Sequence, residues 1–135
     1  MAIKNIFIDT SAFYALMDRS DTHHEKAKNL WIFLLDEESH LLTTNYIIIE
    51  TLALLQSRLG FEAANLFARD ILELVDFIWI DKPRQNLAYE LWLSLGRRKV
   101  SLVDCVSFTA MRHHKIEHIF GFDRHFEKQG YKILV

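Results

Sequence analysis

The stretch that decides the fold is KNIFIDTSAFYAL, residues 4–16. Residues 3–8 are typical of a short buried strand, which ends on Asp9. Thr10 and Ser11 carry hydroxyls that can cap a helix, and the small and apolar residues after them are suited to begin one. The sequence therefore predicts a carboxylate where a strand passes into a helix, which in a parallel α/β sheet is the edge where ligands bind. Because a single strand-ending aspartate is commonly a cap or turn residue, its role depends on residues elsewhere in the chain.

The composition is that of one folded domain. The chain has 135 residues and a mass of 16.0 kDa, and 50% of its residues are hydrophobic, so it can bury a substantial core. One proline and four glycines leave little room for long loops or linkers. We therefore expect a single domain that covers residues 1–135.

Cysteine content, hydropathy and charge restrict where the protein acts and what it binds. Cys105 is the only cysteine, so no disulfide can form within the chain, which suits a reducing compartment. The sequence begins without a signal-like segment, and no apolar run reaches the roughly 18 residues that span a bilayer. We therefore expect a cytoplasmic protein with no membrane contact. The formal net charge of −2 gives no general attraction to nucleic acids, so any such contact must rest on local basic patches.

Apolar runs and helical periodicities alternate along the rest of the chain. After the first strand, they predict further strands at residues 41–43, 77–80, 118–122 and 131–135. Helical spacing predicts amphipathic helices between them, including a helical hairpin that spans residues 46–75. This order predicts an α/β fold in which helices cover both faces of a parallel sheet, giving three layers.

Glu50 interrupts the most apolar helix of the chain, which is predicted at residues 46–59. An ionised glutamate in such surroundings is costly unless it is paired or binds a cation. Two interpretations remain open. Glu50 either binds a cation, or it lies at the helix edge and pairs with Arg58 or another surface cation.

A further acidic residue opens a buried helix. Ser101 and Asp104 have the spacing of a capping box, in which each side chain bonds to the backbone N–H of the other residue. The helix that follows, residues 102–112, is almost wholly apolar and should pack against the sheet. Asp104 would then stand at the buried, positive end of the helix, which suits a carboxylate that binds a metal. A purely structural capping role is the other interpretation.

Two more aspartates end strands. Asp123 follows the fourth predicted strand, and Asp81 follows the third, much as Asp9 follows the first. A Lys-Pro pair comes directly after Asp81, and this is the usual opening of a helix. An N-cap role is therefore a sufficient explanation for Asp81.

The predicted fold brings four carboxylates to one end of the sheet. Asp9 and Asp123 end strands there, while Glu50 and Asp104 project from helices that cross the same end; we call these four residues the acidic quartet. Without a counter-ion, their repulsion would raise some of their pKa values and destabilise the fold, so the arrangement predicts a divalent cation. Oxygen ligands without a cysteine and histidine cluster favour Mg²⁺ or Mn²⁺ over Zn²⁺.

These residues form a pattern that resembles the PIN domain family, and most of all its VapC-type ribonuclease toxins from toxin-antitoxin pairs. The resemblance spans essentially the whole chain and rests on four motifs: IDTS at residues 8–11, Glu50 in the third helix, SLVDCVSF at 101–108 and FDRHF at 122–126. It implies the strand order 3-2-1-4-5, which makes the strands of Asp9 and Asp123 neighbours. Asp81 would then lie roughly 10 Å from Asp9, too far to share an ion.

The resemblance implies a metal-dependent endoribonuclease. The acidic quartet would hold one or two Mg²⁺ or Mn²⁺ ions that activate a water for attack on an RNA phosphodiester, and no side chain need be a covalent nucleophile. Ser11, and to a lesser degree Thr10, would position a ligand carboxylate or a water. Five basic residues would hold the phosphate backbone: Arg97, Arg98, Lys99, Arg112 and Lys115.

The resemblance also implies two protein partners and exposes one departure. The partners are a cognate antitoxin and a second copy of the chain, the latter bound through exposed apolar positions of the hairpin. Many relatives carry Thr or Ser two residues before the last acid, where this chain has Gly121. Glycine supplies no hydroxyl to a metal or its water at this point.

Three other functions compete with this one. A phosphatase of the haloacid dehalogenase type needs a second Asp two residues after the first, where this chain has Ser11. A receiver domain would use Asp81, but it also needs an acidic pair after the first strand and a late lysine. The main alternative is a non-catalytic PIN-like module that binds RNA or protein. Such a module is expected to have lost one or more of the acids, and all four are present.

Overall fold

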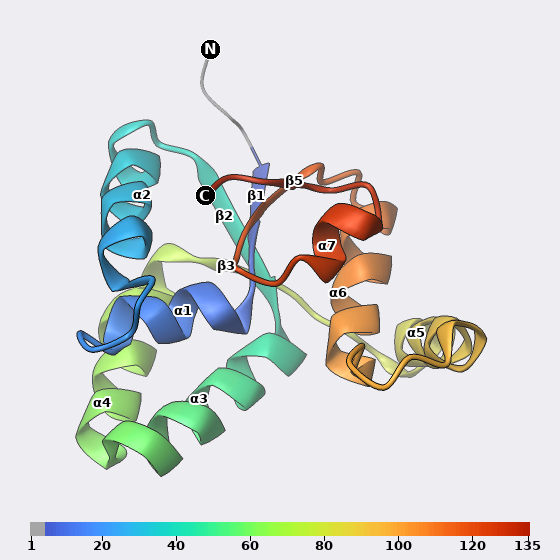
Figure 1. The fold of residues 1–135 in the computed structure, drawn as a ribbon, viewed down its shortest axis with the longest axis horizontal. Coiled ribbons are helices and arrows are strands. Elements are labelled where there is room, and N and C mark those ends of the chain that lie inside the picture. The colour runs from blue at the N-terminus through green and yellow to red at the C-terminus, as the bar shows by residue number, and fades with distance from the viewer. Residues whose placement is uncertain (1–4) are drawn as a thin grey trace.

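The computed structural model describes residues 5–135, and its centre is a sheet of five parallel strands (Figure 1). The strands are β1 (Asn5–Ile8), β2 (His40–Thr44), β3 (Asp76–Ile78), β4 (His118–Phe120) and β5 (Lys132–Ile133). Their order across the sheet is β3-β2-β1-β4-β5, which confirms the predicted order. The first two positions of the predicted strand at residues 3–8 lie outside the described residues.

Helices cover both faces of this sheet. They are α1 (Thr10–Met17), α2 (His24–Asp36), α3 (Asn45–Leu59), α4 (Phe61–Leu66), α5 (Lys82–Leu95), α6 (Leu102–His113) and α7 (His125–Lys128). In Figure 1, α1 to α4 lie on one side of the sheet and α5 to α7 on the other, so the predicted α/β architecture is confirmed. Within residues 5–135, every helix is too short or too polar to cross a membrane.

The central position of β1 places its carboxyl end inside the molecule. Its three apolar residues are fully buried, because β2 pairs on one side, β4 on the other, and helices lie above and below. In the register with β4, Ile8 lies opposite Phe120. The residues that follow these two positions, Asp9 and Gly121, are therefore neighbours at the end of the sheet.

Aromatic pairs fix two helices that border this end. Phe13 of α1 packs edge to face against Phe67, with ring centroids 5.0 Å apart. On the opposite face, Phe108 of α6 makes the same kind of contact with Phe126 of α7 at 4.9 Å. All four rings are fully buried, and each pair contributes roughly 0.5–1.5 kcal/mol beyond the area that it buries.

The third strand is shorter than predicted because a side chain replaces the backbone ladder. β3 ends at Ile78, whereas the apolar pattern predicted a strand to residue 80. The backbone N–H of Ile80 donates to Oδ1 of Asn45 at 2.7 Å, so its bond goes to the start of α3 and not to a neighbouring strand. The alternation of apolar residues cannot distinguish these two partners.

The last two strands are also shorter than predicted. β4 ends at Phe120 and not at residue 122, since the backbone N–H of Phe122 donates to Oγ of Ser11 at 2.9 Å. β5 comprises Lys132–Ile133 and not residues 131–135, because its neighbour β4 offers only three residues for pairing.

The predicted helical hairpin is present, but its second arm is broken. Gly60 connects α3 to α4 with a φ of +102°, in the left-handed range that favours glycine. After α4 the chain passes through a π-helical turn, Phe67–Ile71, and a 3₁₀ turn, Leu72–Leu74. The single helix expected up to Val75 is therefore three shorter segments.

Candidate active site

Asp9 is the most enclosed member of the acidic quartet. It follows β1, caps the N-terminus of α1 and leaves only 6% of its surface exposed. Its backbone N–H donates to the carbonyl of Phe120 at 3.0 Å, which ties the end of β1 to β4. Its Oδ2 accepts from Oγ of Ser11 at 2.8 Å and from the backbone N–H of Ser11 at 3.3 Å. One carboxylate oxygen is thus fixed by the protein, and Oδ1 is left for another partner.

Ser11 connects Asp9 to the chain that follows β4. Its Oγ donates to Asp9 and accepts from the backbone N–H of Phe122 at 2.9 Å. This arrangement supports the positioning role predicted for Ser11. The hydroxyl proton and one of its lone pairs are thus both engaged in holding this turn against Asp9.

Gly121 allows this connection to form. A Cβ atom at this position would lie 2.9 Å from Cβ of Asp9 and 3.3 Å from Oγ of Ser11, distances that require something to move. Sequence reasoning treated Gly121 only as a missing hydroxyl. The structure adds a packing reason, because the space that a side chain would need is filled by Asp9 and Ser11.

Glu50 accepts a hydrogen bond from one hydroxyl and forms no ion pair with a basic side chain of residues 5–135. Its Oε1 accepts from Oγ1 of Thr10 at 2.6 Å, and Thr51 donates in turn to Thr10 at 3.3 Å. Glu50 itself is exposed, so α3 presents it to solvent at the edge of the site. The interpretation that it pairs with Arg58 is wrong, because none of the ion pairs among residues 5–135 joins the two side chains. The Arg58 guanidinium instead lies 5.4 Å from the centroid of the Tyr14 ring.

Asp104 forms the predicted capping box at the start of α6. The backbone N–H of Ser101 donates to Oδ2 of Asp104 at 2.9 Å, and the backbone N–H of Asp104 donates to Oγ of Ser101 at 3.1 Å. The side chain is half-buried. Because the cap uses Oδ2 only, the structural role and the ligand role are compatible.

Asp123 lies in the turn after β4 and has a partner that sequence reasoning missed. The backbone N–H and the ring Nδ1–H of His125 both donate to its Oδ1, at 2.9 and 2.6 Å. The signal for this contact was present in the Asp-Arg-His sequence, since an aspartate commonly bonds two residues ahead in a turn. His125 therefore belongs to the surroundings of the quartet.

Electrostatic repulsion connects the members of the quartet. Burial raises the pKa of Asp9 from 3.8 to about 7, and the charges of Asp104 and Asp123 add to this rise. The hydrogen bonds from Ser11 oppose it. Burial also raises the pKa of Asp104, and the charges of Asp123 and Glu50 act in the same direction. Asp9 thus lies within electrostatic reach of Asp104 and Asp123, and Asp104 lies within reach of Asp123 and Glu50.

The donor set fits a hydrated divalent cation better than an enclosed metal. Within residues 5–135, no three Asp, Glu, His or Cys side chains form a group compact enough to hold a metal ion as they stand. None of the ion pairs in this part of the chain involves Asp9, Glu50 or Asp104, so their charge is not neutralised by a basic side chain. Mg²⁺ commonly keeps several waters and binds through one or two carboxylates. The free oxygens of Asp9 and Asp104 are suited to such an ion.

The predicted basic residues divide between two places. Arg97, Arg98 and Lys99 are exposed in the loop before α6, at the same end of that helix as Asp104. Arg112 and Lys115 are exposed at its other end. With a rise of 1.5 Å per residue, Arg112 lies roughly 12 Å along the helix axis from Asp104. Only the first group is therefore adjacent to a carboxylate of the quartet along α6.

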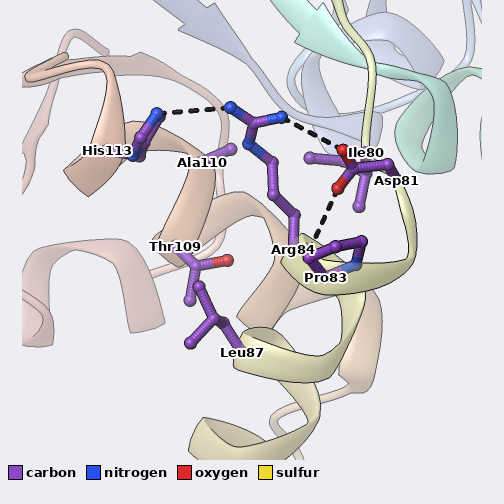
Figure 2. Close-up of a pocket in the computed structure, with 8 residues that line it drawn as sticks. All are labelled: Ile80, Asp81, Pro83, Arg84, Leu87, Thr109, Ala110 and His113. Carbon is purple, nitrogen blue, oxygen red and sulfur yellow. Dashed lines mark hydrogen bonds and ion pairs between the residues drawn. The ribbon is translucent and has the colours of Figure 1, made fainter.

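Asp81 takes the capping role predicted for it. Its Oδ1 accepts from the backbone N–H of Arg84 at 3.1 Å, and its Oδ2 lies 3.5 Å from Nη1 of Arg84. Figure 2 shows these contacts at the rim of a cavity of about 340 Å³ between α5 and α6, with Arg84 also reaching His113. The residues that line this cavity include no member of the quartet. The cavity between α5 and α6 is therefore separate from the acidic quartet.

The comparisons with known proteins agree with this geometry. The model of the PIN domain family matches residues 6–130, and the chain belongs to this family as a ribonuclease of the VapC toxin type. PIN nucleases are generally metal-dependent.

Individual relatives show how far the likeness extends. The chain is 33% identical over 129 residues to the 23S rRNA-specific endonuclease VapC20 of Mycobacterium tuberculosis, an alignment that covers 93% of this chain and 95% of the relative. The crystal structure of VapC20, described as a sarcin-ricin loop cleaving toxin, has a TM-score of 0.84 at 31% identity, with the same coverage. FitAcB from Neisseria gonorrhoeae shares the fold alone, with a TM-score of 0.72 at 14% identity over 96% of both chains.

Proposed function

We propose that the chain acts as a single domain that hydrolyses RNA phosphodiester bonds with Mg²⁺ or Mn²⁺, as the toxin of a type II toxin-antitoxin pair in the cytoplasm. The acidic quartet is the proposed catalytic and metal-binding set. One observation carries the proposal: burial and the charges of neighbouring acids raise the pKa of Asp9 to about 7, at the carboxyl end of the central strand. A fold that gathers unneutralised carboxylates at this point is suited to a divalent cation.

Three of the four carboxylates are oriented by a hydroxyl or a backbone N–H, and the fourth, Asp123, is oriented by the backbone N–H and ring of His125. Ser11 fixes Asp9, Thr10 fixes Glu50, and the capping box fixes Asp104. These bonds restrict how each carboxylate can turn. Because no three acidic side chains of residues 5–135 form a compact group, the ion would bind through one or two carboxylates and keep several waters. A bound Mg²⁺ or Mn²⁺ would polarise a water for attack on the phosphodiester and would stabilise the leaving oxygen.

Ribosomal RNA is the substrate class that the proposal favours. This inference rests on the identity to VapC20, which covers nearly the whole of both chains. Arg97, Arg98 and Lys99 would hold the backbone near Asp104, while Arg112 and Lys115 would contact it farther along α6. Because these contacts are electrostatic, binding should weaken as the salt concentration rises.

Replacement of Asp104 tests the proposed function. Asp104→Asn should lower Mg²⁺-dependent cleavage of ribosomal RNA by at least roughly 100-fold, because a metal ligand is lost together with charge stabilisation. Asn keeps an oxygen that can accept from Ser101, so the helix cap should survive. Cleavage products are counted on denaturing gels, with Mg²⁺ and with EDTA.

Asp81→Asn is the matched control for this test. It alters another aspartate that bonds to the backbone at the start of a helix, and Asn is an equally good cap. Its cleavage rate should equal that of the parent. Equal activity in the Asp104 variant and the parent would refute the site assignment. Loss in the Asp81 variant alone would place the chemistry at the β3 edge of the sheet.

The exposed apolar residues of the α3 and α4 hairpin support the proposed homodimer. Ile49 and Phe61 leave 67% and 66% of their surface exposed, and Leu59 and Leu66 are exposed beside them in sequence. Such residues favour burial against a second copy, or against the antitoxin when it is present. Light scattering should give the mass of a dimer at micromolar concentration without antitoxin. A monomeric mass would contradict this part of the proposal.

A further inference from the structure

A cavity of about 160 Å³ lies beside the turn that carries Asp123. It is formed between the loop before α6 and the short helix α7, and we call it the α7 pocket. Leu95, Val100 and Phe108 contribute its apolar wall, and four polar residues line the rest: Arg97, His125, Lys128 and Gln129. The pocket thus has a basic and polar rim above an apolar wall that includes the buried residues Val100 and Phe108.

The ionisable residues of the α7 pocket are all basic or histidine, although the chain as a whole has a formal net charge of −2. Within residues 5–135, neither Arg97 nor Lys128 takes part in a salt bridge. The neighbouring Arg124, in contrast, lies 3.3 Å from a carboxylate oxygen of Glu127. Two cations therefore face one hollow without an acidic partner, which favours an anionic ligand.

His125 places this hollow directly beside the proposed active site. Its Nδ1 is bonded to Asp123 at 2.6 Å, so the ring orientation is fixed and Nε2 is the ring nitrogen left for another partner. The same side chain lines the α7 pocket. An anion in the pocket would thus be separated from a carboxylate of the quartet by one imidazole ring.

The size of the pocket restricts the kind of anion. Pockets that enclose a whole small-molecule ligand usually have volumes of roughly 300–1,000 Å³. At about 160 Å³ the α7 pocket is too small for a nucleotide, but it can hold a single tetrahedral group with a few waters. Arginine and lysine are the residues that most often hold the phosphates of nucleic acids.

We propose that the α7 pocket binds a backbone phosphate of the RNA substrate, next to the phosphodiester that is cleaved. Arg97 and Lys128 supply the charge, the side-chain amide of Gln129 can donate a directional hydrogen bond, and the ring of His125 forms the wall between the phosphate and Asp123. One phosphate held here would fix the register of the strand across the acidic quartet, as phosphate contacts do in other nucleic-acid complexes. The inference rests on the proposed function, and it adds Lys128, Gln129 and His125 to the residues that contact RNA.

RNA binding without cleavage tests the pocket separately from the nuclease. The probe is a fluorescein-labelled sarcin-ricin loop RNA, and its anisotropy is followed in EDTA so that no metal-dependent hydrolysis can occur. Lys128→Gln should weaken binding about 5-fold to 10-fold and reduce the slope of log affinity against log salt by about one. Lys128→Arg should restore both values because it keeps the charge.

Lys28→Gln is the matched control, since Lys28 is also exposed on a helix but lines none of the cavities beside the site. It should bind the probe as the parent does. With Mg²⁺ present, Lys128→Gln should raise KM for RNA more than it lowers kcat. The proposed phosphate site would be overturned if Lys128→Gln and the parent had equal affinity for the probe, or if the parent showed no measurable binding at low salt. If the parent does not cleave RNA but the variants still differ in affinity as predicted, the proposed nuclease activity is refuted and the proposed phosphate site is not.

Discussion

Asp9 and Asp81 have the same local position, and they differ in almost everything else. Each follows a parallel strand, and each accepts a backbone N–H at the start of the next helix. Asp9 is 6% exposed, lies next to other acids and has no basic partner among residues 5–135. Asp81 is exposed and faces the guanidinium of Arg84.

The difference comes from the place of each strand in the sheet. β1 is central, so its end is closed by α1, by the chain after β4 and by the hydroxyl network around Ser11. β3 is at the edge, so its end faces solvent on one side. The local sequence around an aspartate that follows a strand is therefore enough to make it a helix cap. It becomes a candidate metal ligand only where its strand is central in the sheet and other acids lie near it.

The pH dependence of stability should separate the two aspartates most strongly. The pKa of Asp9 is raised from 3.8 to about 7, so the folded state holds a proton that the unfolded chain has already released. This contribution is present in full below pH 3.8 and is lost as the pH rises to about 7, for a total of at most roughly 4 kcal/mol. In EDTA, the free energy of unfolding measured with urea should therefore fall from pH 5 to pH 8.

Asp9→Asn should remove most of this fall, because it deletes the buried charge, and should be more stable than the parent at pH 8 in EDTA. Asp81→Asn should follow the parent at every pH. Parallel pH profiles for Asp9→Asn and the parent would show that Asp9 ionises as easily in the folded protein as in the unfolded chain.

Metal binding should reverse the order of these variants. A ligand at one hundred times its Kd adds about 2.7 kcal/mol to the stability of the state that binds it. Mn²⁺ should therefore raise the Tm of the parent and of Asp81→Asn by several degrees in thermal shift measurements. Asp9→Asn should lose most of this increment. An unchanged Mn²⁺ shift in Asp9→Asn would count decisively against Asp9 as a ligand.

Most of the fold could be predicted because its signals are local and repeated. The alternation of strands and helices predicts the parallel sheet, and the motifs around Asp9, Asp104 and Asp123 indicate the family that gives the strand order. The capping roles of Asp81 and Ser101 also follow from residues within one turn. The catalytic and metal-binding roles of the quartet stay predictions.

What the sequence did not reveal depends on contacts between distant segments. Ser11 and Phe122 are 111 residues apart, and their hydrogen bond both ends β4 and holds Asp9. Asn45 ends β3 in a similar way through Ile80. The hydrophobic periodicity of the sequence does not indicate such contacts, because each contact depends on how two elements pack. The same holds for Gly121, whose missing side chain is explained only by the closeness of Asp9.

The smallest expected effect concerns the cap at the edge of the sheet. Asp81→Ala should destabilise the protein by about 1 kcal/mol, because the backbone N–H of Arg84 loses its acceptor at the start of α5. Asp81→Asn keeps that acceptor and loses only an exposed ion pair, so its stability should change by less than about 0.5 kcal/mol. Urea denaturation distinguishes the two values. Because Asp81 has no part in the proposed site, Mn²⁺ should raise the Tm of both variants as much as it raises that of the parent. A smaller rise in Asp81→Ala alone would mean that the start of α5 is coupled to the acidic quartet. The ends of β1 and β3 would then not be independent.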